Sequence, residues 1–91
     1  MEKWEYLKVD LYGGSGGEGK ITINPRKNLD LAAFLKKYPK VTLREEKYET
    51  YLAYEGFDPA LTSAFLDYLG ENSWEAYSAN GTSYYFKRKI T

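Results

Sequence analysis

Residues 74–90 read WEAYSANGTSYYFKRKI, and this stretch predicts a β-hairpin. Asn80-Gly81 is the preferred two-residue loop of type I′, and both flanks are rich in residues that favour strands. Trp74–Ala79 is therefore expected to pair with Thr82–Ile90. The hairpin makes an antiparallel sheet the starting point of the fold.

This loop also predicts which side chains share a face of the hairpin. Tyr77 is expected opposite Tyr84, and Glu75 opposite Phe86, because residues alternate between faces along a strand. The expected core side carries Tyr77, Tyr84, Phe86 and Ile90. The opposite side is expected to carry Tyr85, Lys87 and Lys89, with Trp74 near Lys87 in a cation–π contact.

A second hairpin is predicted at the other end of the sequence. Trp4–Tyr12 alternates, with Leu7 and Val9 on the apolar side and aromatic residues on the other side. Five glycines in the seven residues 13–19 interrupt this pattern, and Lys20–Asn24 resumes it. The two runs are expected to pair as antiparallel neighbours.

Two amphipathic helices are predicted between these hairpins. Asn28 is the expected N-cap of the first, and Pro39 stops it. Asp58 is the expected N-cap of the second, Pro59 occupies its first turn, and Gly70 lies just past its end. Lys40–Gly56, between the helices, is compatible with two strands or with a helix, and its Tyr and Thr residues favour strands.

These elements predict an α+β fold with an antiparallel sheet, two helices packed on one face and a closing β-hairpin. Two hairpin-plus-helix halves precede that hairpin, and residues 1–91 are expected to form a single domain. The expected core comprises Leu7, Val9, Ile21, Ile23, Leu31, Phe34, Leu35, Leu61, Phe65, Leu69, Tyr84 and Phe86.

The composition excludes several kinds of site. The 91 residues include no Cys and no His, which excludes disulfides, thiol nucleophiles, imidazole catalysis and Cys/His metal sites. Thirteen basic residues balance thirteen acidic ones, so no net charge drives the chain onto nucleic acid or anionic lipid. No apolar run is long enough for a membrane span and no signal peptide is evident, so a cytoplasmic location is expected.

Residues 14–19 match the GxGxxG pattern of dinucleotide-binding proteins letter for letter. In those proteins a helix follows the glycines and its free amides bind the pyrophosphate, whereas Lys20–Asn24 has strand alternation. We therefore interpret the motif as a hairpin loop and expect no cofactor.

Carboxylates are the other candidates for chemistry. Asp67, Glu71 and Glu75 lie on or near the second predicted helix, but this spacing is typical of a solvated helix edge. We expect neither an enzyme nor a metal site.

The candidate binding site is the sheet face that the helices leave uncovered. It combines aromatic rings with lysines: Trp4, Tyr6, Lys8, Tyr12, Tyr85, Lys87 and Lys89. Such a face can support a self-complementary dimer, can stack the bases of single-stranded nucleic acid, or can simply stabilise cross-strand pairs. The RNA-binding signature of a basic residue, a glycine and an aromatic run is absent, which disfavours nucleic acid.

Three segments resemble a small bacterial domain-of-unknown-function family. Residues 1–9 are similar to its opening, which typically reads Trp-Glu-Tyr-Lys-Val, residues 66–77 to its Leu-Gly…Gly-Trp-Glu-Leu-Val segment, and residues 84–88 to its closing Tyr-Tyr-Phe-Lys-Arg. Ser73 stands where that family usually has Gly. The resemblance implies a strand, a helix and a hairpin, and it implies no activity.

We therefore expect a non-enzymatic protein-binding domain that binds a protein partner or a second copy of itself. One alternative is a single-stranded nucleic-acid module. The other is a small inhibitor that occupies a basic site on a host protein through an acidic segment, comprising Glu45, Glu46, Glu49, Glu55 and Asp58.

Overall fold

The computed structural model describes residues 2–12, 18–55 and 59–90. Six strands and two α-helices follow one another in the order ββαββαββ, with a 3-10 helix, η1, before the first α-helix. The strands are β1 (Trp4–Tyr12), β2 (Glu18–Asn24), β3 (Thr42–Glu45), β4 (Thr50–Glu55), β5 (Glu75–Asn80) and β6 (Ser83–Lys89). The helices are η1 (Arg26–Asn28), α1 (Ala32–Lys37) and α2 (Pro59–Glu71).

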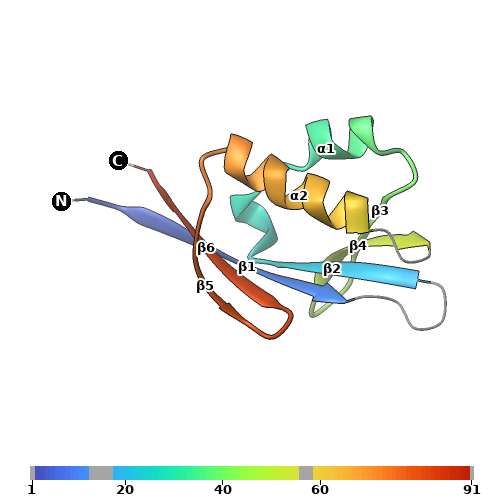
Figure 1. The fold of residues 1–91 in the computed structure, drawn as a ribbon, viewed down its shortest axis with the longest axis horizontal. Coiled ribbons are helices and arrows are strands. Elements are labelled where there is room, and N and C mark those ends of the chain that lie inside the picture. The colour runs from blue at the N-terminus through green and yellow to red at the C-terminus, as the bar shows by residue number, and fades with distance from the viewer. Residues whose placement is uncertain (1, 13–17, 56–58, 91) are drawn as a thin grey trace.

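All six strands join one antiparallel sheet in the order β3-β4-β2-β1-β6-β5. The pairs β1–β2, β3–β4 and β5–β6 are hairpins, and the first of them pairs with the other two through β2–β4 and β1–β6. Both α-helices lie on the same side of this sheet (Figure 1). The predicted α+β class, the helices on one face and the final hairpin are confirmed.

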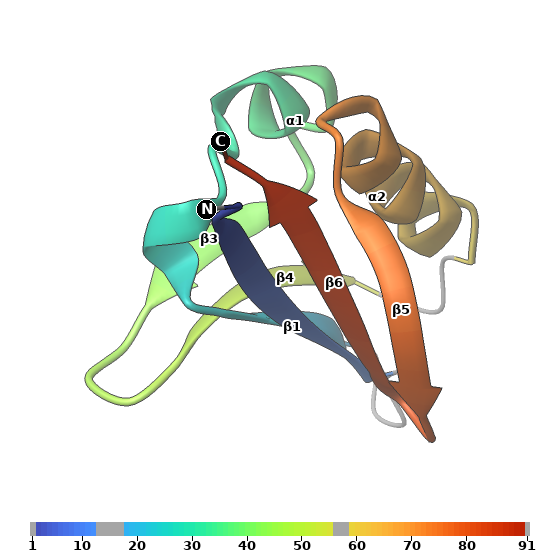
Figure 2. The ribbon, with the colours of Figure 1, turned by 90° about the vertical axis from the view of Figure 1, so that its left-hand side faces the viewer.

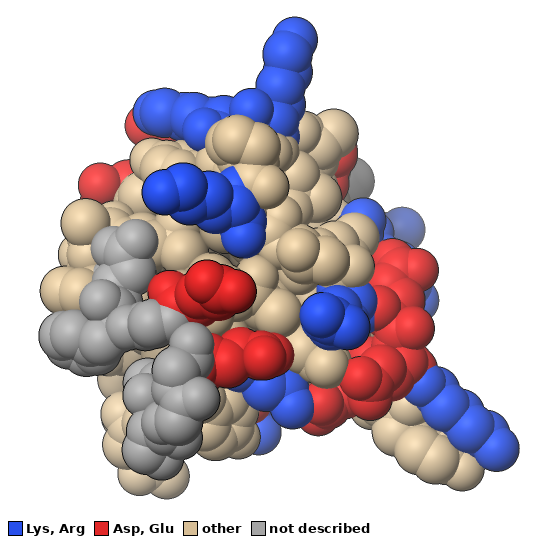
Figure 3. All heavy atoms as spheres, turned by 90° about the vertical axis from the view of Figure 1, so that its right-hand side faces the viewer, with Lys and Arg blue, Asp and Glu red and all other residues tan. Residues whose placement is uncertain are grey.

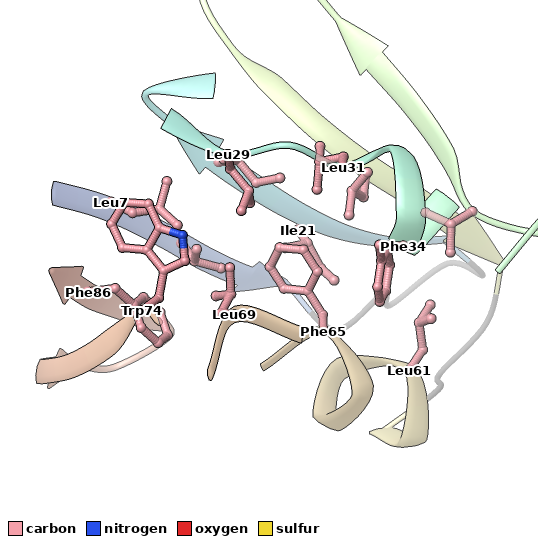
Figure 4. Packing of buried hydrophobic residues seen from close by; sticks show 14 of the residues in the cluster. Leu7, Ile21, Leu29, Leu31, Phe34, Leu61, Phe65, Leu69, Trp74 and Phe86 are labelled. Carbon is pink, nitrogen blue, oxygen red and sulfur yellow. The ribbon is translucent and has the colours of Figure 1, made fainter. Parts of the chain in front are cut away.

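The core fills the space between the sheet and the helices (Figure 4). Leu7 pairs with Phe86 and Val9 with Ile23, so three adjacent strands present their apolar sides together. Phe34 of α1 and Phe65 of α2 meet edge to face, with ring centroids 5.2 Å apart. Ten predicted core residues are buried: Leu7, Val9, Ile21, Ile23, Leu31, Phe34, Leu61, Phe65, Leu69 and Phe86.

Some core predictions are wrong. Leu35 and Tyr84 are only partly buried, and Tyr77 and Ile90 are half-exposed. Residues absent from the predicted core but buried in the structure are Leu29, Val41, Leu52, Ala53, Tyr54 and Trp74. Most of these residues lie in segments whose apolar residues follow no clear helical or strand spacing, so the sequence did not predict their burial.

The predicted register of the last hairpin is also wrong. Asn80 pairs with Ser83, so the loop is Gly81-Thr82, with Gly81 at φ 63°. A positive φ at the first loop position suits the Gly-first hairpin turn better than the Asn-Gly turn. The register then shifts between Ala76 and Ser78, which marks a β-bulge at Tyr77.

The helix boundaries differ from the predicted ones for local reasons. Asn28 closes η1, and its side-chain amide donates to the Tyr6 carbonyl instead of capping α1. The Asp30 carboxylate accepts from the Ala32 amide at 3.0 Å and takes the capping role. Lys37 is the last residue of α1, in agreement with a stop at Pro39.

Helix α2 begins at Pro59, as predicted, but continues past Gly70 to Glu71. The Trp74 amide donates to the Leu69 carbonyl at 2.9 Å, and the Ser73 amide to Gly70 at 3.1 Å. Together with φ 70° at Ser73, these bonds form a Schellman motif. Its hydrophobic contact joins Trp74 and Leu69, which carries Trp74 into the core.

The described residues resolve one alternative that the sequence left open. Thr42–Glu45 and Thr50–Glu55 are strands, which confirms the strand interpretation of the segment between the helices. The predicted glycine loop at residues 13–17 and the predicted cap at Asp58 lie outside the described residues.

Gly19, the last glycine of the GxGxxG pattern, lies within β2 and pairs with Tyr54. The Tyr54 ring packs directly over its backbone, so that a Cβ placed on Gly19 would lie 2.2 Å from the ring. This glycine therefore has a packing role in the sheet.

Candidate interaction surface

The sheet face turned away from the helices is called the outer face. Figure 2 shows both helices above the sheet, with the loop ends of the β3–β4 and β5–β6 hairpins at the bottom of the view. All seven predicted site residues alternate onto this face from β1 and β6. Tyr6 is 54% and Tyr12 50% exposed. Lys89 is exposed, and Trp4, Lys8, Tyr85 and Lys87 are half-buried.

The bulge adds a ring that the sequence pattern had placed in the core. Tyr77 lies on the outer face, 6.3 Å from Tyr6 and 6.4 Å from Tyr85 between ring centroids. The Tyr6–Tyr77 contact is edge to face, a favourable arrangement for aromatic rings. Trp4, Tyr6, Tyr77 and Tyr85 are called the aromatic cluster. No signal in the sequence marks the bulge that completes it.

Lysines interleave with these rings. The Lys87 ammonium lies 4.9 Å from the Trp4 ring centroid and 5.9 Å from that of Tyr77. Lys8 lies 5.9 Å from the Tyr85 centroid and forms an ion pair with Asp10 at 3.8 Å. Lys89 is paired with Glu2 at 3.0 Å. The cations of this surface are therefore largely neutralised within the chain.

The predicted contact between Trp74 and Lys87 is wrong. Trp74 is 4% exposed on the core side, and its cation is Arg88, whose guanidinium carbon lies 4.4 Å from the ring centroid. Arg88 also pairs with Glu5 and donates to the carbonyls of Asn72 and Asn28. These contacts connect β6, β1, η1 and the end of α2.

Beside the aromatic cluster, the outer face is hollowed by about 370 Å³. Tyr12 lies at this hollow together with Lys8 and Asp10 of β1. Its opposite side is formed by Glu46–Glu49, the loop of the β3–β4 hairpin. Tyr48 in this loop is 87% exposed. We call this feature the hairpin hollow.

The acidic segment is compensated within the chain. Arg26 pairs with Glu45 at 3.6 Å, and Lys20 pairs with Glu49. The hydrogen bond with Glu49 raises the pKa of Lys20 above its usual 10.5. Glu55 is exposed, and Asp58 lies outside the described residues.

Glu46 has a different partner. It accepts a hydrogen bond from the Tyr51 hydroxyl at 2.8 Å, which raises the pKa of Tyr51 above 10.0. This bond favours the neutral phenol, so it does not activate Tyr51 as a nucleophile or base.

A larger open hollow, of about 860 Å³, lies at the opposite end of the molecule from the two termini. Lys37, Lys40 and Arg44 line it together with Glu18 and Glu55, over an apolar floor that includes Tyr38, Tyr54 and Leu61. In Figure 3, blue and red side chains alternate over this end. Such mixed charge selects no single class of ligand.

The carboxylates that the sequence offered for chemistry lie on the molecular surface. Asp67, Glu71 and Glu75 are all exposed. Within residues 2–12, 18–55 and 59–90, no group of three potential ligands converges to hold a metal ion. Over the same residues, no helix is long and apolar enough to cross a membrane.

Comparisons of this chain with protein-family models, with curated proteins and with solved structures each found no match. The resemblance to a domain-of-unknown-function family therefore stays a prediction. The outer face, with its aromatic cluster and hairpin hollow, is the candidate interaction surface.

Proposed function

We propose that this protein is a non-enzymatic protein-binding domain that associates with a second copy of itself through the outer face. The observation that carries the proposal is the aromatic cluster, in which Tyr6 and Tyr77 remain half-exposed in mutual contact. Tyrosine is enriched among the residues that dominate binding energy at interfaces, since it offers a large rigid surface at low entropic cost.

Electrostatics support a second copy as the partner. The chain carries no formal net charge, so two copies do not repel each other at long range. Lys8 and Lys89 are already paired with Asp10 and Glu2, so bringing two such faces together does not confront two bare basic patches.

The same ion pairs disfavour single-stranded nucleic acid. Affinity for nucleic acid comes mainly from cations that replace the counterions of the phosphates. On the outer face, Lys8, Lys20 and Lys89 each already pair with a carboxylate. The rings and Lys87, which is in none of the ion pairs found among the described residues, would have to provide the affinity.

Sedimentation equilibrium from micromolar to millimolar concentration tests the proposal. The wild-type protein should show a concentration-dependent monomer–dimer equilibrium. Tyr6→Thr keeps strand propensity and removes a half-exposed ring without leaving a cavity, so it should raise the dimer Kd about tenfold. Ile90→Thr is the matched control, because Ile90 is 51% exposed but lies outside the aromatic cluster.

A strictly monomeric wild-type protein at millimolar concentration would refute self-association. Equal effects of Tyr6→Thr and Ile90→Thr would remove the aromatic cluster from the interface. Tight, salt-dependent binding of a short oligothymidine, lost in Tyr6→Thr, would support the nucleic-acid alternative instead.

A further inference from the structure

We infer that the two copies dock about a two-fold axis that pairs Lys87 of each copy with Glu46 of the other. This inference rests on the proposed function and specifies the geometry of the same surface. The partner is a second copy of this chain, and one type of ion pair forms twice across the interface.

The charges of the outer face single out these two residues. The ion pairs on this face are Lys8–Asp10, Lys20–Glu49 and Lys89–Glu2. None of the ion pairs among the described residues includes Lys87 or Glu46.

Lys87 contacts the rings of Trp4 and Tyr77, although Glu75 is its cross-strand neighbour on β5. Glu46 accepts a hydrogen bond from the neutral Tyr51 hydroxyl and lies near Lys20, whose ion pair is with Glu49. Lys87 and Glu46 can therefore each form an ion pair with a residue of a bound partner.

The two residues lie at opposite sides of one continuous surface. Lys87 is on β6, next to the edge strand β5, within the aromatic cluster. Glu46 begins the β3–β4 loop and lines the hairpin hollow. Lys8 joins the two regions, since it lies over the Tyr85 ring and also lines the hollow.

In a two-fold interface, if one region of the first copy contacts another region of the second, the reverse contact is also made. An axis that passes near Lys8 places the aromatic cluster of one copy over the hairpin hollow of the other. Tyr6 and Tyr77 then meet Tyr12 and Tyr48, the other two strongly exposed tyrosines. The same operation brings Lys87 to Glu46 at both ends.

Charge reversal gives a direct test by sedimentation equilibrium. In a homodimer of Lys87→Glu, the new carboxylate of each copy faces the Glu46 carboxylate of the other. In a homodimer of Glu46→Lys, the new ammonium of each copy faces the Lys87 ammonium of the other. Each variant should therefore raise the homodimer Kd by at least about tenfold, because like charges in contact are strongly unfavourable. An equimolar mixture restores both opposite-charge pairs, so it should form a heterodimer with a Kd within about threefold of the wild-type value.

Two controls separate this pairing from misfolding and from net charge. Lys36→Glu introduces the same charge change as Lys87→Glu on exposed α1, across the sheet from the interface, and should leave the Kd unchanged. Melting temperatures verify that the variants fold. Glu46→Gln keeps an acceptor for Tyr51 and should weaken association less than Glu46→Lys does.

The outcomes are distinguishable. Recovery of dimers only in the mixture supports the Lys87–Glu46 pairing. A wild-type protein that dimerises while the mixture stays monomeric overturns this pairing and leaves the outer face as the interface. A wild-type protein that never dimerises overturns both the pairing and the proposed function.

Discussion

Adding one methyl group at Gly19 should destabilise the fold through the Tyr54 ring. A Cβ there would lie 2.2 Å from two carbons of the ring, whereas ordinary van der Waals contacts are 3.4 Å or longer. The ring must therefore move away by more than an ångström. Tyr54 is 8% exposed and packs in the core. Overpacking of this kind typically costs about 1–3 kcal/mol, and about 2 kcal/mol would lower the Tm of a domain this size by about 8–16 °C.

Thermal and urea unfolding of Gly19→Ala measure this cost, and Gly70→Ala is the matched control. No atom lies within 4 Å of a Cβ on Gly70, which is helical, so alanine there should stabilise α2 by up to about 1 kcal/mol. In a Tyr54→Val background the cost of Gly19→Ala should fall by at least about half, because the clashing ring is gone. An unchanged cost in that background would refute the steric explanation.

Three further predictions concern single side chains. Ser73→Gly should stabilise the protein by about 1 kcal/mol in thermal melts, and Ser73→Ala should not, because φ 70° is costly for any residue with a Cβ. Arg88→Lys should lower the free energy of unfolding in urea by about 2 kcal/mol, since one ammonium cannot replace the guanidinium between Glu5 and two carbonyls. Glu46→Gln should lower the pKa of Tyr51 towards 10.0 in an absorbance titration of tyrosinate. Folding raises the pKa of Tyr51, so this bond stabilises the wild-type protein fully below pH 10.0, and the stabilisation is lost as the pH rises through the folded-state pKa. The free energy of unfolding of Glu46→Gln should therefore fall less at alkaline pH than that of the wild-type protein. An unchanged titration of Tyr51 would show that the Glu46 carboxylate does not raise its pKa.

The periodic segments of the sequence predicted the architecture well. Trp4–Tyr12 alternates strictly, and its apolar side is the core side of β1. The apolar spacing of Leu61, Phe65 and Leu69 likewise predicted the buried face of α2. Where one face of an element is buried and its period is clear, the pattern alone specifies orientation.

The candidate site was only partly predictable, because β5 has no such pattern. Every residue of Glu75–Asn80 is exposed, so burial does not select one register over another. The Gly81-Thr82 loop and the bulge at Tyr77 then decide the pairing. The observed loop shifts the predicted pairing by two residues, which keeps the faces, whereas the bulge adds a one-residue shift that turns Tyr77 to the outer face. Without the bulge, the pattern assigned Tyr77 to the core, and the aromatic cluster lacked its fourth ring.

Trp74 was misplaced for a related reason. Its position is set by the Schellman motif that ends α2, and Gly70 had seemed the natural end of that helix. The motif instead uses Ser73, a residue that rarely adopts a positive φ. Sequence rules that look for glycine therefore miss this turn and the buried ring that follows it.

The pairing of β1 with β6 has a consequence for how the chain acquires its structure. Trp4 lies opposite Lys89, so the β1–β6 ladder joins the first and the last strand of the sheet in chain order. Until β6 emerges from the ribosome, one edge of the nascent β1–β2 hairpin has no neighbour, and contacts so distant in sequence form slowly. The sheet is thus expected to close only after β6 has been synthesised, and the free edge of β1 stays accessible to chaperones until then.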